Sequence, residues 1–158
     1  MVKTNTFRHL FVVAILLAST LFAGCASVPM ASKEEDAAAK AFKAPEADKA
    51  GVYVFRDSNF GAAVKKIVSL DGMPLFQSAP KTYFYAEVLP GKHTLATESE
   101  FGENTLDFVA EGGKNQFFRN YIKMGVFVGG ANLEAVSEDE GKKGVEESGL
   151  AAPLVKKQ

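Results

Sequence analysis

Cysteine and tryptophan are nearly missing from this sequence. Among 158 residues there is one cysteine, Cys25, and no tryptophan. A single cysteine excludes a disulfide within the chain, so the fold must rest on packing alone. Histidine is almost as scarce, with only His9 and His93. So few thiols and imidazoles argue against a zinc site and against Cys–His or Ser–His catalysis. We therefore expect no metal and no cofactor.

The chain also lacks a dominant charge and a long hydrophobic run. Eighteen basic and nineteen acidic residues give a formal net charge of −1. Nucleic-acid binding depends on concentrated basic residues, so we expect no nucleic-acid partner. The apolar run Leu10–Ala18 is much shorter than the roughly 20 residues that a membrane-spanning helix needs.

What the first residues do contain is an export signal. Two basic residues precede the run Leu10–Ala18, and the small residues Ala23 and Gly24 stand immediately before Cys25. A basic head, a short apolar core and a small-residue cleavage site describe a secretory signal peptide. The stretch resembles a bacterial lipoprotein signal, which is cleaved here between Gly24 and Cys25. We predict a signal peptide at residues 1–24 and lipid attachment at Cys25. The alternatives for Cys25 are an incidental cysteine of the signal or an intermolecular disulfide.

The lipid decides where we expect the protein to be. Lipoprotein cysteines of this kind resemble those that carry up to three acyl chains. Several chains anchor a protein stably, because each buried CH₂ contributes about 0.8 kcal/mol. The membrane is then a partner through the lipid on Cys25 rather than through polypeptide. Ala26 rather than Asp follows the cysteine, which by resemblance favours the outer membrane. We expect a lipid-anchored protein of the bacterial cell envelope, facing the periplasm.

The segment after the cysteine is rich in small and charged residues. Ser32 and Glu35 form a capping-box pattern, alanines follow, and Pro45 ends the helical stretch. We predict that residues 25–49 are a lipidated, partly helical tether. The alternative is that Phe42 docks this helix onto the domain.

From residue 50 onward the residue pattern is typical of β-strands. Asp71-Gly72 between two apolar runs is a strong hairpin signal, and Tyr83–Val88 alternates with a period of two. Short strands separated by turns predict a mostly β fold, a small antiparallel β-sandwich or open barrel with a short N-terminal helix or tether. We place the β domain at residues 50–148 and a frayed tail at residues 149–158, because the last residues of a domain are poorly ordered unless other segments hold them.

Four residues are candidates for a binding face. Tyr53, Tyr83 and Tyr85 could present an aromatic face to a sugar or peptide, although alternate aromatic residues are more often core. Arg56 ends an apolar strand. We expect its guanidinium to reach a carbonyl or a carboxylate, with Glu87 as one candidate partner, and the functional alternative is an anion-binding role.

The order of several motifs resembles a known family. These motifs are the strand Tyr53–Arg56, the Asp71-Gly72 turn, the turn Pro90–Thr94 and the pair Gly113-Lys114. They resemble the small bacterial lipoprotein family called domain of unknown function 2846, over residues 48–148. The resemblance implies a lipid-anchored β domain with no assigned activity, and therefore no catalytic residue to carry over.

Two functions from different classes remain. The preferred one is a non-enzymatic binding or structural module that holds an envelope protein or a glycan at a sheet face or edge, for example by strand addition. The alternative is a cell-wall glycan hydrolase with paired carboxylates among Glu98, Glu100 and Glu103. We name no catalytic residue and expect the protein not to be an enzyme.

Overall fold

The structure is a computed structural model that describes residues 27–126 and 128–154. The predicted signal peptide, its cleavage site at Gly24 and the lipid site at Cys25 lie outside the described residues. The strands are β1 (Ala50–Arg56), β2 (Lys66–Leu70), β3 (Met73–Ser78), β4 (Thr82–Val88), β5 (Gly91–Glu98), β6 (Glu103–Ala110), β7 (Asn115–Lys123), β8 (Gly130–Val136) and β9 (Gly149–Leu150), and the helices are α2 (Lys33–Lys40) and α3 (Glu138–Glu146).

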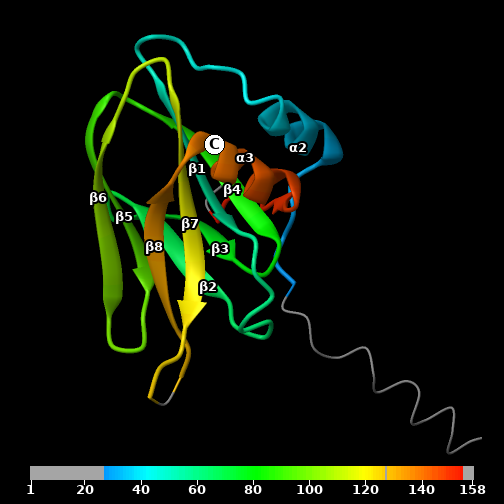
Figure 1. The fold of residues 1–158 in the computed structure, drawn as a ribbon, viewed down its shortest axis with the longest axis vertical. Helices are drawn as coiled ribbons and strands as arrows, with labels where there is room; N and C mark the ends of the chain where they lie inside the picture. The colour runs from blue at the N-terminus through cyan, green and yellow to red at the C-terminus, as the bar shows by residue number, and fades with distance from the viewer. Residues whose placement is uncertain (1–26, 127, 155–158) are drawn as a thin grey trace, which may run out of the picture.

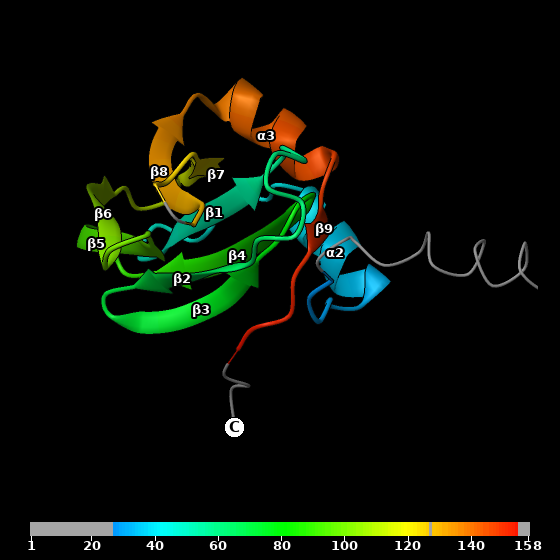
Figure 2. The ribbon, with the colours of Figure 1, turned by 90° about the horizontal axis from the view of Figure 1, so that it is seen from below.

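Two sheets pack face to face, and both helices lie against the outer face of one of them (Figure 1, Figure 2). The five-stranded sheet has the order β8-β7-β1-β4-β9, and the four-stranded sheet has the order β3-β2-β5-β6. The predicted mostly β sandwich is confirmed, and the sheets do not close into a barrel. The four-stranded sheet is antiparallel, whereas β1 pairs in parallel with β7 and β4 pairs in parallel with β9. Between β1 and β7 the chain crosses to the four-stranded sheet twice, first for β2 and β3 and then for β5 and β6. Strand β7 then runs in the same direction as β1.

Strand β1 is buried along its whole length because both faces of its sheet are covered. Val52 and Val54 face the four-stranded sheet and belong to the core between the sheets. Tyr53 and Phe55 face the helices and form a second core with side chains of α2 and α3. The strand therefore lacks the polar alternation of a half-exposed strand.

Two local predictions are confirmed in detail. Asp71 and Gly72 have φ values of 50° and 78°, the left-handed pair that a type I′ hairpin turn requires. At α2, Ser32 Oγ accepts a hydrogen bond from Glu35 N at 3.2 Å, and Ser32 N donates to Glu35 Oε2 at 2.9 Å. This is the predicted capping box.

Residues 27–49 are not a loose tether, because α2 and its flanks pack on the five-stranded sheet. The Tyr53 hydroxyl donates to Ala39 O at 2.8 Å, and the rings of Phe42 and Tyr53 are 5.5 Å apart. Asp36 Oδ1 accepts from Leu150 N at 2.9 Å. The structure thus has the docked arrangement of Phe42, which stabilises a helix too short to persist alone.

The prediction of a frayed tail is wrong for residues 149–154. Ala31 N donates to Leu150 O at 2.9 Å, and Ala152 N donates to Pro29 O at 2.9 Å, so the two ends of the described chain are paired. Leu154 N donates further to Leu75 O at 2.8 Å. Backbone hydrogen bonds to distant segments order this tail, and the side chains of Leu150 and Ala151 pack against the two cores.

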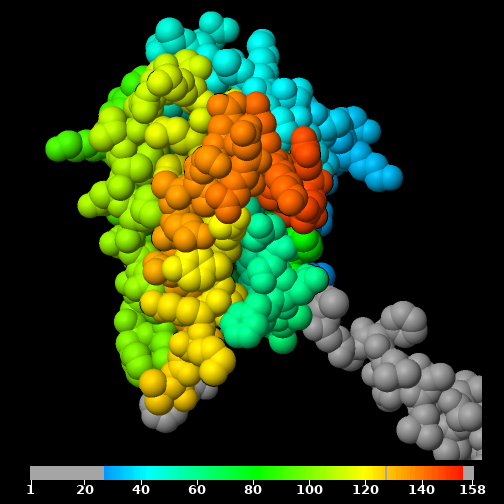
Figure 3. All heavy atoms as spheres, viewed as in Figure 1, coloured from blue at the N-terminus to red at the C-terminus, as the bar shows by residue number. Residues whose placement is uncertain are grey.

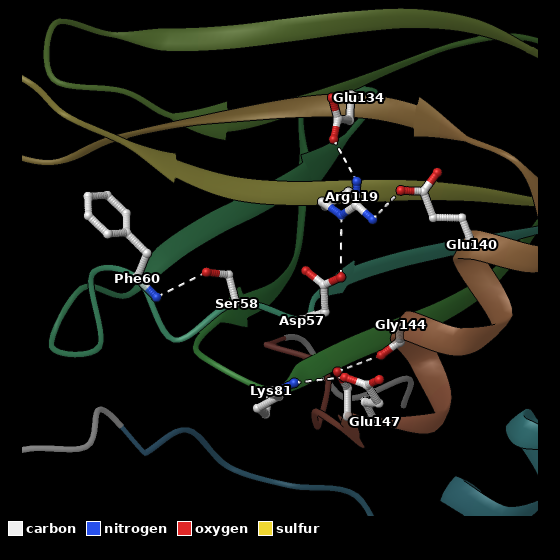
Figure 4. A network of polar contacts seen from close by, with 10 residues as sticks. Asp57, Ser58, Phe60, Lys81, Arg119, Glu134, Glu140, Gly144 and Glu147 are labelled. Carbon is white, nitrogen blue, oxygen red and sulfur yellow. Dashed lines mark hydrogen bonds and ion pairs between the residues drawn. The ribbon is translucent and has the colours of Figure 1, made fainter.

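Helix α3 is attached to the sheet by Arg119 of β7 (Figure 4). Its guanidinium donates to Glu134 Oε1 on β8 at 2.9 Å and to Glu140 Oε1 on α3 at 2.6 Å. It also lies 3.4 Å from Asp57 Oδ2 and over the ring of Phe55. One half-buried cation therefore joins α3 to β1, β7 and β8.

Candidate functional site

The outer side of β4 is only partly paired. Strand β9 covers Thr82 and Tyr83 and then ends. Tyr83 O accepts a hydrogen bond from Ala151 N on this outer side. The backbone groups of every second residue in a strand point to the same side, so the N–H and C=O groups of Tyr85 and Glu87 also point outward. Among the described residues, nothing pairs with these four backbone groups. We call the stretch from Phe84 to Val88 the β4 edge.

A pocket of about 450 Å³ lies on the helix side of the β4 edge. Tyr85 and Tyr53 form part of its floor, and Glu87 stands at the strand. The opposite wall is α2 and the chain after it, including Glu35, Lys43, Ala44, Pro45 and Glu46. Three carboxylates and one ammonium group give this α2-side pocket an acidic lining.

A second hollow of about 560 Å³ lies on the other side of the β4 edge, where the two sheets part. Phe84, Ala86 and Val88 of β4 line it together with Leu70, Leu75 and two prolines, Pro74 and Pro153. Most of these side chains are apolar and belong to, or pack against, the core between the sheets. We call this hollow the inter-sheet groove.

Two of the three candidate tyrosines do not form an exposed face. Tyr53 is 1% exposed and Tyr83 is not exposed, and their hydroxyls donate to Ala39 O and Asp36 O of α2. Burial raises the pKa of Tyr53 to about 12 and also raises that of Tyr83. Only Tyr85 reaches the α2-side pocket with a partly exposed ring, and its hydroxyl donates to Glu87 Oε1 at 3.0 Å.

Arg56 is fully buried, and backbone carbonyl groups surround its guanidinium. Its guanidinium donates to Val64 O at 2.8 Å and to Phe60 O and Gly61 O, each at 2.9 Å. The expected partner Glu87 is instead bonded to Tyr85. Burial lowers the pKa of Arg56. The residue closes the β1–β2 loop (57–65) and is not available to an external anion.

Most of the carboxylates considered for hydrolysis hold the backbone. Glu98 Oε2 accepts from Ile67 N at 2.8 Å, and Glu100 accepts from Val126 N at 2.7 Å and Val128 N at 3.1 Å. Glu103 is exposed at the start of β6. This arrangement ties two loops together at one end of the sandwich.

His93 lies between two acceptors. Its Nδ1 is 2.6 Å from Asp71 Oδ2 and its Nε2 is 2.8 Å from Leu89 O. Both ring nitrogens therefore face oxygen atoms, an arrangement that suits the protonated ring. The hydrogen bond to Asp71 raises the pKa of His93. The described residues contain no group of three His, Cys, Asp or Glu side chains arranged to hold a metal ion.

Comparison with known proteins identifies the family. A family model described as protein of unknown function (DUF2846) matches residues 46–131, more than half of the chain. The chain belongs to this family. An uncharacterized protein of Haemophilus influenzae strain Rd is 47% identical over 138 residues, which make up 87% of this chain and 82% of that protein. No solved structure matches the chain.

The DUF2846 match includes the β4 edge and the strands that line the inter-sheet groove, β2 and β3. It excludes α2, α3 and β9. Helix α2 and the residues after it form one wall of the α2-side pocket, and of this wall only Glu46 lies within the matched stretch. Among the described residues, no helix has the length and apolar character needed to cross a membrane.

Sequence reasoning found the two alternating faces of β4 but not the site they border. Tyr83, Tyr85 and Glu87 face the helices, and Phe84, Ala86 and Val88 face the other sheet, as the period of two predicts. The open backbone depends on β4 standing next to a strand of only two residues. The signal in the sequence for this open edge was the shortness of the last strand, β9.

Proposed function

We propose that this DUF2846 protein is a lipid-anchored envelope protein that binds an extended peptide segment along the β4 edge. The observation that carries the proposal is the unpaired backbone of Tyr85 and Glu87 with a hollow on each side of the strand. A peptide strand added here gains main-chain hydrogen bonds, and its alternate side chains enter the two hollows.

The linings indicate the chemistry of the segment. Side chains on one face of the added strand meet the mostly apolar inter-sheet groove. Those on the other face meet the α2-side pocket, where Glu35, Glu46 and Glu87 outnumber Lys43. An alternation of apolar and basic residues satisfies both hollows at once. The proposed ligand class is therefore an extended protein segment with this alternation.

A proline substitution tests strand addition directly. The N–H of Glu87 points outward, so Glu87→Pro removes a donor that an added strand needs without removing a β1–β4 hydrogen bond. Glu87→Ala removes the same carboxylate but keeps the N–H. The probe is the fluorescent hexapeptide Lys-Leu-Lys-Val-Lys-Leu with blocked ends, and a second peptide of equal composition carries its lysines in one block.

We expect the alternating peptide to bind the mature chain more tightly than the second peptide and to shift the amide resonances of Tyr85 and Glu87. We expect Glu87→Pro to weaken binding at least about tenfold relative to Glu87→Ala, a loss of about 1.4 kcal/mol that corresponds to one main-chain hydrogen bond. Equal affinity of the two variants, with both folded by circular dichroism, would rule out strand addition.

The anchor is the other half of the proposal. Its support is the sequence pattern that ends at Cys25, because several acyl chains bind a bilayer durably. Cys25→Ser expressed in bacteria should move the protein from the sedimenting membrane fraction to the soluble fraction. Mass spectrometry of the wild-type protein should show acyl chains on Cys25. An unmodified thiol there would refute the anchor and leave the peptide site untouched.

A further inference from the structure

Exposed apolar side chains gather at one end of the sandwich. They lie on the β1–β2 loop (57–65), the β5–β6 turn (99–102) and the β7–β8 loop (residues 124–126 and 128–129). We call these three segments the loop end. Five of the ten large hydrophobic side chains exposed among the described residues are here: Phe60 (54%), Phe101 (76%), Met124 (85%), Val126 (79%) and Val128 (58%).

Strand directions and loop contacts place these segments together. Strands β1 and β7 are parallel, so the loops that follow Arg56 and Lys123 leave the same end of their sheet. The carboxylate of Glu100 in the β5–β6 turn accepts from the N–H groups of Val126 and Val128. Figure 1 shows all three segments at the lower end of the molecule, and Figure 3 shows the β1–β2 and β7–β8 loops protruding there.

The loop end is held in shape by its own hydrogen bonds. Arg56 binds three carbonyl groups of the β1–β2 loop, at Phe60, Gly61 and Val64. Together with Glu100, it satisfies backbone groups that would otherwise be costly to remove from water. The apolar side chains therefore project from ordered loops in which these backbone hydrogen bonds are already formed within the protein. Lys65 and Lys123 are exposed beside them and can reach lipid phosphates.

The N-terminal end of the described chain lies in the same lower half of the molecule, at the blue end of the ribbon in Figure 1. Val28 is buried at 9% exposure, and Pro29 O accepts from Ala152 N, so the chain is fixed to the domain from its second described residue. Ser27, the first described residue, follows Cys25 by two positions, a reach of about 7 Å. A lipid on Cys25 therefore brings the bilayer close to this side of the domain.

We infer that the loop end contacts the bilayer surface, with Phe60, Phe101 and Met124 among the side chains that enter the headgroup region. The inference rests on the proposed lipid anchor, which supplies the membrane and the short distance to it. The anchor holds the protein at the membrane, and the loop end fixes which side of the domain faces it. The β4 edge begins beyond β9, away from the loops that follow Arg56 and Lys123.

The absence of tryptophan makes the contact measurable, because a single introduced tryptophan is the only indole in the chain. Met124→Trp and Phe60→Trp report on the loop end. Leu89→Trp is the matched control, since Leu89 is 63% exposed and lies in the β4–β5 turn at the opposite end. The lipidated full chain is placed in vesicles of phosphatidylethanolamine and phosphatidylglycerol, with and without brominated acyl chains.

We expect blue-shifted emission and bromine quenching for Met124→Trp and Phe60→Trp, and neither effect for Leu89→Trp. If the vesicles float with the protein but no tryptophan is quenched, the contact is refuted while the anchor stands. If the wild-type protein does not float with vesicles, both proposals fail. A blue shift that persists without vesicles and grows with protein concentration shows a second copy on the loop end, and that result also overturns the inference.

Discussion

Replacing Gly144 by alanine separates two physical effects that have opposite signs. In an isolated helix, Ala is favoured over Gly by about 0.8–1 kcal/mol, so helix propensity alone predicts a more stable protein. In the structure, a Cβ on Gly144 would stand 2.9 Å from Phe55 Cζ and closer still to Cδ2 and Cε2. Real Cβ atoms essentially never approach a ring so closely, so something must move.

The ring has little room to move. Phe55 is not exposed, and the guanidinium of Arg119 lies 5.4 Å from the centre of its ring. Overpacking a filled core costs about 1–3 kcal/mol. If α3 moves outward instead, the fully buried Val145 loses part of the roughly 1.5–3 kcal/mol that its burial contributes. Because the added Cβ meets three atoms of the buried ring at under 3.0 Å, we expect a cost of about 2–3 kcal/mol, the upper part of this range. After the gain in helix propensity, the net loss of stability is about 1–2 kcal/mol.

Urea unfolding followed by circular dichroism measures the difference. Lys143→Ala is the control, because this residue is exposed on the same helix and should change stability by less than about 0.5 kcal/mol. The double variant Gly144→Ala/Phe55→Leu should lose less unfolding free energy than the two single variants lose in total, because the smaller side chain makes room for the added Cβ. A stabilisation of Gly144→Ala by about 1 kcal/mol would show that α3 does not pack as described.

Two further predictions concern single side chains. Arg56→Met should lower stability by about 3 kcal/mol, because three carbonyls of the 57–65 loop lose a charged donor while the cost of burying the guanidinium disappears. Unfolding in urea and proteolysis of this loop measure the change, and an unchanged midpoint would contradict it. His93→Gln should cost about 0.5–1 kcal/mol between pH 5 and pH 6 and less at pH 8.5. The folded pKa of His93 is raised, mainly by Asp71, so its contribution is complete below its ordinary pKa of 6.5 and is lost as pH rises through the folded value. The pKa of Asp71 is lowered, first by the hydrogen bond from Thr94 N and then by His93, so that contribution is lost only as pH falls below 3.8. Thermal unfolding across this range tests it, and a loss that grows with pH would have the wrong sign.

Features encoded by neighbouring residues could be predicted from the sequence. The Asp71-Gly72 turn needs only two residues with positive φ, and the Ser32–Glu35 cap needs only four consecutive residues. The alternation of Tyr83–Val88 likewise follows from the geometry of one strand. In each case the partners are a few residues apart, so local rules suffice.

Features that depend on distant partners could not be predicted. The docking of α2 requires Tyr53 and Leu150, and the order of the last residues requires Pro29 and Ala31. An oxygen partner for Arg56 is predictable, but its three carbonyls belong to a loop whose path no propensity describes. The candidate site has the same origin, because an open strand edge is a property of strand order and is not written in the strand itself.

The pairing of the two ends of the described chain has a consequence for biogenesis. Residues 150–152 leave the ribosome long after residues 29–31, with which they form hydrogen bonds. The layer formed by β9 and α2 therefore cannot assemble until the ribosome has released residue 152. Until then α2 lacks the hydrogen bond that Leu150 N donates to Asp36 Oδ1.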